Sequence, residues 1–227
     1  MLKRHRPLVH CQPFGWVPGR GRLESMYQLT AAGARLLAEL NRCREQDIIY
    51  PKTPLKFQRD YEHRKGLVDL HIALRAWAAQ DPEREVIRFD PYYFRPGKRP
   101  LTQLQIRPDP QLPPDYAKVI EPDAIIHYRE GQKTTLAAVE LHWATDTRRI
   151  AKQLDRHITA LSQNLIAERY GHDEPHVVFS VHQNPATRQS VQRWFRESAD
   201  GQTFAPFFRW YDFDPLLRCV HSAKTPE

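Results

Sequence analysis

The sequence predicts an α/β fold of the α+β type, in which a mixed β-sheet is flanked by helices. Apolar residues recur at helical spacing in several segments, and runs rich in Val, Ile and aromatic residues lie between those segments. From residue 66 onward the predicted order is helix, three strands, helix, strand, helix. A strand hairpin that is followed by a crossover helix and another strand places antiparallel and parallel neighbours in one sheet.

The composition is typical of a globular protein. The chain has 227 residues, of which 41% are hydrophobic, slightly below the usual share of roughly 45–50%, so it can bury a sizeable core. No run approaches the ~18 apolar residues of a membrane span, and the basic start lacks the apolar segment of a secretory signal. The three cysteines are odd in number and far apart, which argues against a disulfide framework or a cysteine-based zinc site. We therefore expect a protein of the reducing cytoplasm without a membrane partner.

The charge balance favours a polyanionic partner. Lys and Arg total 34 while Asp and Glu total 27, which leaves a formal charge of +7. Clusters of cations attract phosphates at long range. The charges are spread along the chain rather than gathered in one block, so a disordered basic tail is not expected.

The first part of the chain predicts one short strand and one helix. Residues 1–25 show little periodicity, and residues 27–30 have the pattern of a strand. Thr30 is a good N-cap for a helix over 31–41, whose apolar face contains leucines at spacings of three and four, namely Leu36, Leu37 and Leu40. Prolines interrupt the residues that follow and predict a linker.

The rest of the chain supplies the elements of the sheet domain. A helix is predicted over 66–80 and a strand over 86–94, and a long proline-rich loop follows. Glu130-Gly131-Gln132 is a tight-turn signal between strands at 120–128 and 134–143. After this hairpin we expect a long helix, a strand, a helix and an aromatic tail with a further strand, at 146–169, 176–182, 185–197 and 204–220.

Several common catalytic motifs are absent from the sequence. It has no GxxxxGK[ST] phosphate loop, no GxGxxG dinucleotide fingerprint and no GxSxG nucleophile elbow. No two of its 11 histidines are separated by a single residue, which excludes the His-hydrophobic-His metal site of common tyrosine relaxases and rolling-circle initiators. His172 and His176 have i, i+4 spacing, but Pro175 between them argues against a helix, so we interpret them as loop histidines.

Two acidic residues are placed to meet at one end of the predicted hairpin. Asp123 opens one strand, and Glu140 ends its neighbour. Adjacent strands lie about 4.8 Å apart, so the two carboxylates can approach each other at the same end of the sheet. Two carboxylate oxygens suit a hard cation such as Mg²⁺ or Mn²⁺, which polarises a phosphodiester and activates water. We therefore predict a metal-binding catalytic site at this pair.

Other acidic residues compete for this role. Asp109 and Asp115 also follow prolines, but both lie in the proline-rich loop rather than at the start of a strand, so Asp123 is preferred. Asp69 and His71 lie on the first helix of the sheet domain, where we interpret them as solvated polar positions.

Several stretches of sequence resemble a known family. VIEPDAII and LAAVELHWATDTRRIAKQLDRHITAL resemble the core of the PD-(D/E)XK nuclease superfamily, and MYQLTAAGARLLAEL resembles the passage from the wing to the last helix of winged-helix proteins. Together with the helix GLVDLHIALRAW before the sheet, they resemble the replication-relaxation family of plasmid and mobile-element proteins. A complete winged helix needs roughly 45 residues before its wing, more than precede Tyr27, so only the wing and the last helix are expected.

The resemblance implies a domain order and an activity. It implies a partial winged helix over 1–46, a linker over 47–65 and a restriction-endonuclease-like nuclease domain over 66–227. It further implies DNA as the partner, and Mg²⁺- or Mn²⁺-dependent nicking at a replication or transfer origin. A homodimer and complexes with other mobile-element proteins stay open as further assemblies.

One residue departs from the nuclease pattern. The pattern places Lys two residues after the Glu, and replication-relaxation proteins commonly carry an acidic residue there, but this chain has His142. Lys152 on the following helix can take over the basic role, or His142 can fill it. A neutral His142 can instead act as a ligand or as a general base.

Basic residues near these motifs are candidate DNA contacts. Arg149, Lys152 and Arg156 form one stripe of the helix that directly follows the acidic pair. Arg20 and Arg22 resemble the tip of a wing, which often touches a DNA backbone.

Three classes of function follow from these observations. The first is a metal-dependent DNA nickase, and the second is a catalytically inactive DNA-binding accessory or regulatory factor with the same fold. The third is a structural or protein-interaction module, which would not bind DNA at low salt. Salt-sensitive DNA binding suits the first two classes, and metal-dependent cleavage suits only the first.

Overall fold

The computed structural model describes residues 7–19, 21–48, 50, 61–94, 99–112, 118–214 and 216. The chain forms two units, Met1–Tyr61 and Glu62–Glu227, and each is described by itself. The boundary between them falls inside the predicted linker at 47–65. Within the described part of the chain, no helix has both the length and the apolar character needed to cross a membrane.

The first unit is built from two small antiparallel ladders and one helix. β1 (Val9–Gln12) pairs with β4 (Met26–Leu29), and between them in sequence β2 (Trp16–Val17) pairs with β3 (Gly21–Arg22). α1 (Ala31–Asn41) follows, and then the short 3₁₀ helix η1 (Glu45–Asp47). Thr30 Oγ1 accepts a hydrogen bond from Gly33 N at 3.2 Å, which confirms the predicted N-cap.

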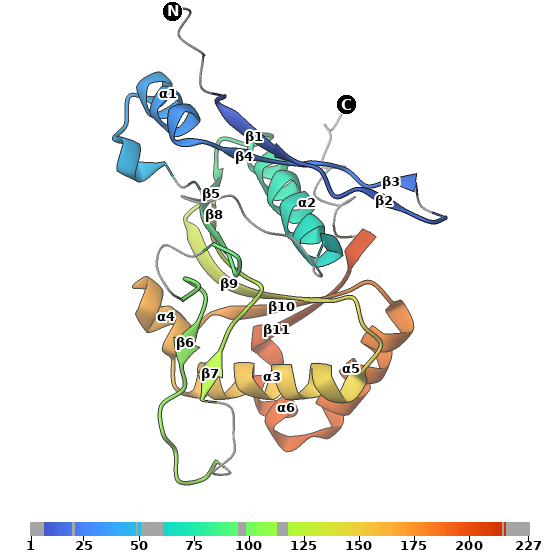
Figure 1. Cartoon of the computed structure of the whole chain (residues 1–227). Helices are drawn as coiled ribbons and strands as arrows, with labels where there is room; N and C mark the ends of the chain where they lie inside the picture. Colours follow the sequence, from blue (N-terminus) through green and yellow to red (C-terminus); the bar gives the residue numbers. More distant parts are fainter. Residues whose placement is uncertain are drawn as a thin grey trace, which may run out of the picture. The chain divides into compact units, whose positions relative to one another are not determined.

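The second unit contains a five-stranded mixed sheet, so the predicted mixed sheet is confirmed. Its strand order is β11-β10-β9-β8-β5 (Figure 1). β8 (Ala124–Glu130) runs antiparallel to β5 (Arg84–Pro91) and to β9 (Lys133–His142). β10 (Val177–His182) runs parallel to β9 and to β11 (Phe208–Asp212).

The turn between β8 and β9 fixes the register of the central hairpin. Glu130 pairs with Lys133, so only Gly131 and Gln132 lie between the two strands. Gly131 has a φ of +60°, a value that tight hairpin turns require and that glycine adopts at low cost. The predicted hairpin is therefore confirmed, together with the position of its turn.

Helices cover both faces of this sheet (Figure 1). α2 (Tyr61–Ala78) packs on one face through Leu67 and Leu70, which share a hydrophobic core with residues of β5, β8 and β9. The other face is covered by four helices: α3 (Thr147–Ser162), α4 (Leu165–Tyr170), α5 (Pro185–Glu197) and α6 (Ala199–Phe204). α3 and α5 pack against each other on this face.

The prediction of one continuous helix over 146–169 is wrong, because the structure has two helices there. α3 ends at Ser162, and Asn164 adopts a left-handed conformation with a φ of 53° before α4 begins at Leu165. Asn tolerates this conformation better than most residues, so it ends the first helix without a glycine or proline signal. The apolar spacing continues across the break, which explains why the pattern predicted one helix.

Other boundaries also differ from expectation. The strand predicted over 120–128 is split into β7 (Val119–Ile120), which pairs with β6 (Leu104–Gln105), and β8. Pro122 lies between them and has no N–H to donate to a ladder. α2 begins before residue 66, and α6 was not predicted. The 3₁₀ helix η2 (Ala205–Phe207) leads into β11, the strand expected in the aromatic tail.

Gly66 allows α2 to lie close to the sheet. A Cβ atom at this position would come within 2.7 Å of Trp143 Cζ2 and 3.2 Å of Leu141 Cδ1. A side chain here would therefore push the helix or these two residues away. The close approach matters for the site because His63, one turn earlier on α2, reaches the beginning of β8.

Candidate functional site

Asp123 and Glu140 lie close together where the hairpin ladder ends. The last pair of the ladder is Ala124 and Val139, and Asp123 and Glu140 are the next residues on the two strands. Asp123 N donates to Val139 O at 3.0 Å, one residue out of the register of the ladder, so the two strands stay attached where their regular pairing ends. The structure thus brings the two acidic residues singled out in the sequence together at one end of the sheet.

Asp123 is held by contacts on both of its carboxylate oxygens. Oδ2 accepts a hydrogen bond from Leu141 N at 2.7 Å, and Oδ1 lies 2.8 Å from His63 Nε2. The side chain is only 15% exposed. The carboxylate is therefore fixed in position by β9 on one side and by α2 on the other.

Glu140 lies deeper in the protein and is held from α3. Its side chain is buried, and Oε1 lies 2.7 Å from His157 Nε2. Gln153 Nε2 approaches Oε2 at 3.5 Å, the long end of the hydrogen-bond range. Both partners come from the helix that follows the hairpin, so α3 orients the second carboxylate.

The Asp123 carboxylate acts strongly on Glu140. Burial raises the pKa of Glu140 well above its ordinary value, and the Asp123 carboxylate raises that pKa further through its charge and through a side-chain hydrogen bond. The positive charges of Arg156 and Arg149 act in the opposite direction. The buried pair therefore favours the presence of a positive charge, either a shared proton or a bound cation.

The acidic pair fits a hard cation in the kind and number of its donor atoms. Mg²⁺ commonly takes one or two protein carboxylates, while water and phosphate fill its other positions. Among the residues that the structure describes, no group of three or more His, Cys, Asp and Glu side chains is arranged to hold a metal ion. If a hard cation binds at this end of the sheet, Asp123 and Glu140 are the residues that would supply its two protein carboxylates.

His142 does not replace the charge of the lysine in the nuclease pattern. It is buried, and its ring centroid lies 4.6 Å from that of His182. Burial is the main cause that lowers the pKa of His142 to about 3, followed by the charge of His182. His142 is therefore neutral at pH 7, which leaves only the neutral roles expected for it. Lys152 is exposed on α3 and makes no contact with either carboxylate in the described part of the chain.

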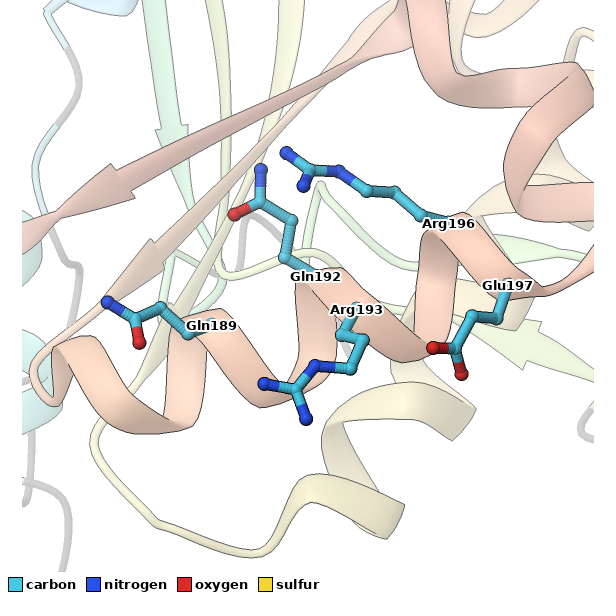
Figure 2. A pocket seen from close by; sticks show the side chains of 5 residues that line it. All are labelled: Gln189, Gln192, Arg193, Arg196 and Glu197. Atoms are coloured by element: carbon cyan, nitrogen blue, oxygen red, sulfur yellow. The ribbon is translucent and has the colours of Figure 1, made fainter.

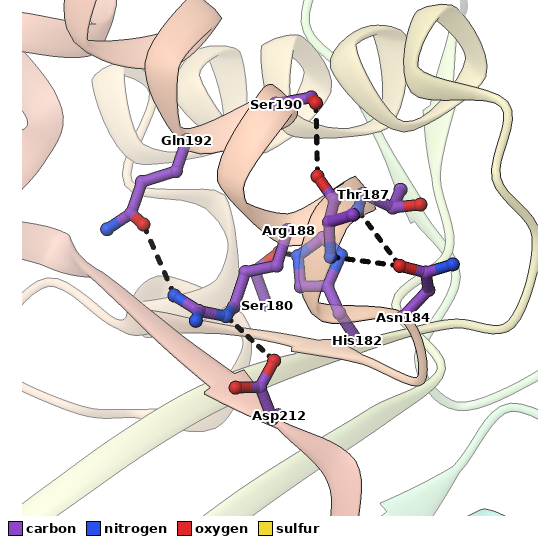
Figure 3. A network of polar contacts seen from close by, with 9 residues as sticks. Ser180, His182, Asn184, Thr187, Arg188, Ser190, Gln192 and Asp212 are labelled. Carbon is purple, nitrogen blue, oxygen red and sulfur yellow. Dashed lines mark hydrogen bonds and ion pairs between the residues drawn. The ribbon is translucent and has the colours of Figure 1, made fainter.

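A polar network that includes His182 lies at the ends of the parallel strands (Figure 3). The strand register aligns His142, His182 and Asp212 across β9, β10 and β11. His182 Nε2 lies 2.9 Å from Ser180 Oγ, and Arg188 Nε donates to Asp212 Oδ1 at 2.8 Å. The network ties this edge of the sheet to α5. Burial lowers the pKa of His182 to about 4, so its ring is neutral at pH 7.

Two further histidines are buried near Glu140. The ring centroids of His157 and His176 lie 6.3 Å apart, and both side chains are fully buried. Neither ring nitrogen of His176 has a hydrogen-bond partner among the described residues, and His157 Nδ1 also lacks one. Burial lowers the pKa of His176 to about 3 and that of His157 well below its ordinary value. Acidification would therefore force charge into this part of the core.

The predicted DNA contacts lie in different parts of the chain. Arg149 and Lys152 are exposed on α3, and Arg156 is half-buried there. Arg149 and Arg156 are close enough for their charges to act on Glu140. Arg22 is exposed on β3 of the first unit, and Arg20 lies outside the described residues.

A second cationic surface lies on the outer side of α5 (Figure 2). A hollow of about 400 Å³ is lined there by polar and charged side chains, namely Gln189, Gln192, Arg193, Arg196 and Glu197. Within the described part of the chain, neither arginine forms an ion pair. The hollow shares no residue with the acidic pair, so it offers an internal comparison for the arginines of α3.

The competing acidic residues have local structural partners or lie elsewhere. Lys65 Nζ contacts Asp69 Oδ2 at 2.7 Å, and the His71 ring stacks on Phe89 with centroids 4.2 Å apart. Asp109 Oδ1 accepts from Gln111 N at 2.8 Å in a loop turn. Asp115 lies outside the described residues. These contacts agree with structural roles for the described competitors.

The sequence pattern missed the histidines that surround the acidic pair. His157 lies inside the apolar stripe of α3, between Leu154 and Ile158, and this position was a signal that its side chain is buried. His63 precedes the residues that show the helical pattern of α2, so no periodicity pointed to it. His182 lies at the end of a strand that was predicted, but only the sheet register shows that it faces His142.

We expect His176→Leu to stabilise the second unit, and more so at acidic pH. At pH 8 the replacement of an unpartnered buried polar ring should raise the free energy of unfolding by about 1 kcal/mol. Because the pKa of His176 is lowered to about 3, protonation of the unfolded chain costs stability as the pH falls below 6.5. The variant has no such titrating group, so at pH 5 its free energy of unfolding should exceed that of the wild type by about a further 2 kcal/mol. Urea unfolding at both pH values measures the difference, and an unchanged pH dependence would contradict this account.

Comparisons with known proteins gave no match for this chain. No protein-family model matches it, and neither the curated proteins nor the solved structures contain a significant match. What the site does must therefore be inferred from the residues of this chain and from their geometry.

Proposed function

We propose that this protein binds DNA and nicks one strand of it in the presence of Mg²⁺ or Mn²⁺. Asp123 and Glu140 form the catalytic site in this proposal. The observation that carries the proposal is the closeness of two carboxylates where the β8–β9 ladder ends, with the pKa of Glu140 raised by burial and by Asp123. Acidic pairs with perturbed pKa values are concentrated at catalytic and metal sites. The resemblance to replication-relaxation proteins points to DNA of a plasmid or mobile element, at a replication or transfer origin.

The residues of the site have distinct parts in this proposal. Asp123 and Glu140 would hold the ion, which when bound polarises the phosphodiester and activates water. Leu141 N and His63 keep the Asp123 carboxylate in place before the substrate arrives. Arg149 and Arg156, whose charges already act on Glu140, would bind phosphates of the strand near the carboxylates.

The elements within each unit support the proposal of a DNA partner. In the first unit, β1 and β4 enclose the β2–β3 hairpin and are followed by α1, the element order expected for a wing and a last helix. Arg22 is exposed in this hairpin. In the second unit, a mixed sheet lies between α2 and α3, as in the restriction-endonuclease-like fold that the resemblance implies. The proposal therefore includes two fold assignments. The first unit is a partial winged helix, and the second unit is a nuclease-like domain.

A second function is favoured by the residue at position 142. His142 is neutral and buried where the nuclease pattern has a lysine, and Lys152 does not contact the acidic pair in the described structure. A domain that has lost this charge would bind DNA without cleaving it. The alternative is therefore a catalytically inactive accessory or regulatory factor that uses the same basic surfaces.

We expect metal-dependent nicking of a supercoiled plasmid that carries the native locus. Asp123→Asn and Glu140→Gln should each lower the rate at least about 100-fold, because the ion loses one of its two carboxylates. Glu121→Gln is the matched control, since Glu121 lies two residues before Asp123 and is exposed. Its rate should stay within about twofold of the wild type because this side chain does not belong to the pair.

The outcomes of this assay separate the two functions. Nicking that requires metal and is lost in both site variants would support the nickase. If the wild type binds DNA without nicking it, and the site variants bind equally well, the inactive factor would be the better description. Equal nicking by the wild type and the site variants would rule out this acidic pair as the catalytic site.

We expect the arginines of α3 to make phosphate contacts that those of α5 do not make. Arg149→Gln with Arg156→Gln should reduce the salt slope of DNA binding by about 2, or about one per lost phosphate contact. Arg193→Gln with Arg196→Gln removes the same charge from α5 and should change the slope by less than about 1. Fluorescence anisotropy over a salt series measures both slopes. An equal effect of the two pairs would show that only net charge matters.

A further inference from the structure

One histidine holds each carboxylate of the acidic pair, and the two histidines come from opposite faces of the sheet. His63 on α2 contacts Asp123 Oδ1 at 2.8 Å, and His157 on α3 contacts Glu140 Oε1 at 2.7 Å. Both contacts use the Nε2 atom of the ring. The acidic pair is therefore held between two helices, with one ring nitrogen on each carboxylate.

These contacts oppose the tendency of the two carboxylates to move apart. When both carboxylates are ionised, as the binding of a cation requires, they repel each other, and a glutamate side chain has several rotatable bonds through which it can move away. Asp123 Oδ2 is already fixed by Leu141 N at 2.7 Å, so His63 on Oδ1 prevents the carboxylate from rotating. The 3.5 Å approach of Gln153 to Glu140 Oε2 is weaker, so His157 is the principal restraint on Glu140.

Packing alone does not explain a histidine at position 157. The side chain is fully buried within the apolar stripe of α3, and its Nδ1 atom has no hydrogen-bond partner in the described structure. An unpartnered buried nitrogen lowers stability, and an apolar residue of similar size would avoid this cost. The contact of Nε2 with Glu140 is the feature that sets this histidine apart from its neighbours in the stripe.

We propose that His63 and His157 are positioning residues that fix the carboxylates of Asp123 and Glu140 so that both can bind one divalent cation. The inference rests on the proposed function and adds two residues to the site that the sequence pattern did not contain. Each histidine donates its Nε2–H to one carboxylate oxygen and leaves further lone pairs of that carboxylate for the ion. Partners that orient metal ligands in this way typically change metal affinity by about 10–100-fold when they are removed.

The test compares a variant that keeps the donor with one that removes it. A glutamine amide nitrogen lies at about the same distance from the backbone as Nε2, so His157→Gln and His63→Gln keep an N–H donor for the carboxylate. His157→Leu and His63→Leu fill similar space without a donor. His176→Leu is the control, since His176 is a buried neighbour of His157 whose ring nitrogens contact neither carboxylate.

Isothermal titration of the full-length chain with Mn²⁺ gives the readout, without any need for DNA or cleavage. The leucine variants should bind Mn²⁺ about 10–100-fold more weakly than the wild type, and the glutamine variants within about threefold of it. The His176→Leu control should bind like the wild type. Rescue by glutamine separates positioning from a general structural role, because loss of packing would not be repaired by a hydrogen-bond donor.

Each outcome decides a different part of the account. A wild type that binds no Mn²⁺ would overturn the metal-dependent function and this inference together. A wild type that binds Mn²⁺ while the leucine variants bind it equally well would overturn the inference alone, as would glutamine variants as weak as the leucine variants. If His157→Leu does not fold, the His63 variants decide, because the His63 side chain is 26% exposed and its replacement disturbs the core less.

Discussion

The side chain of Asp123 takes the place of a backbone acceptor at the end of the β8–β9 ladder. Its N–H bonds to Val139 O and its carboxylate accepts from Leu141 N, so Asp123 is attached to β9 by main chain and side chain at once. Pro122 precedes it and cannot extend the ladder. This double attachment fixes the Asp123 carboxylate close to Glu140, and the remaining features of the site follow from that position.

Two acids that lie side by side create an electrostatic problem, and the fold places the neutral ring of His157 and the charges of two arginines around Glu140. Glu140 is desolvated and repelled by Asp123, yet its direct partner is the neutral ring of His157 rather than a cation. Arg149 and Arg156 act on it only by their charge. A buried carboxylate that is paired with a cationic side chain already has a compensating charge, whereas the direct partners of Glu140 are the ring of His157 and the amide of Gln153.

Local patterns predicted the elements that hold the site better than they predicted its contacts. The two apolar strand segments and the glycine turn between them were enough to place Asp123 close to Glu140, because a tight turn fixes the register of its hairpin. The break at Asn164 was missed because the apolar spacing runs through it. The apolar stripe of α3 indicated that His157 is buried, but sequence spacing does not show which residue a buried histidine contacts, and His63 lies before the helical pattern of α2.

The most direct test of this account is the position of Mn²⁺ in crystals of the full-length protein, located by its anomalous scattering. The account predicts one ion bound by carboxylate oxygens of both Asp123 and Glu140, at about the 2.0–2.2 Å expected for a small hard cation, with His63 and His157 still on the carboxylates. An ion bound instead by the rings of His142 and His182, or a pair that holds no ion at saturating Mn²⁺, would contradict it.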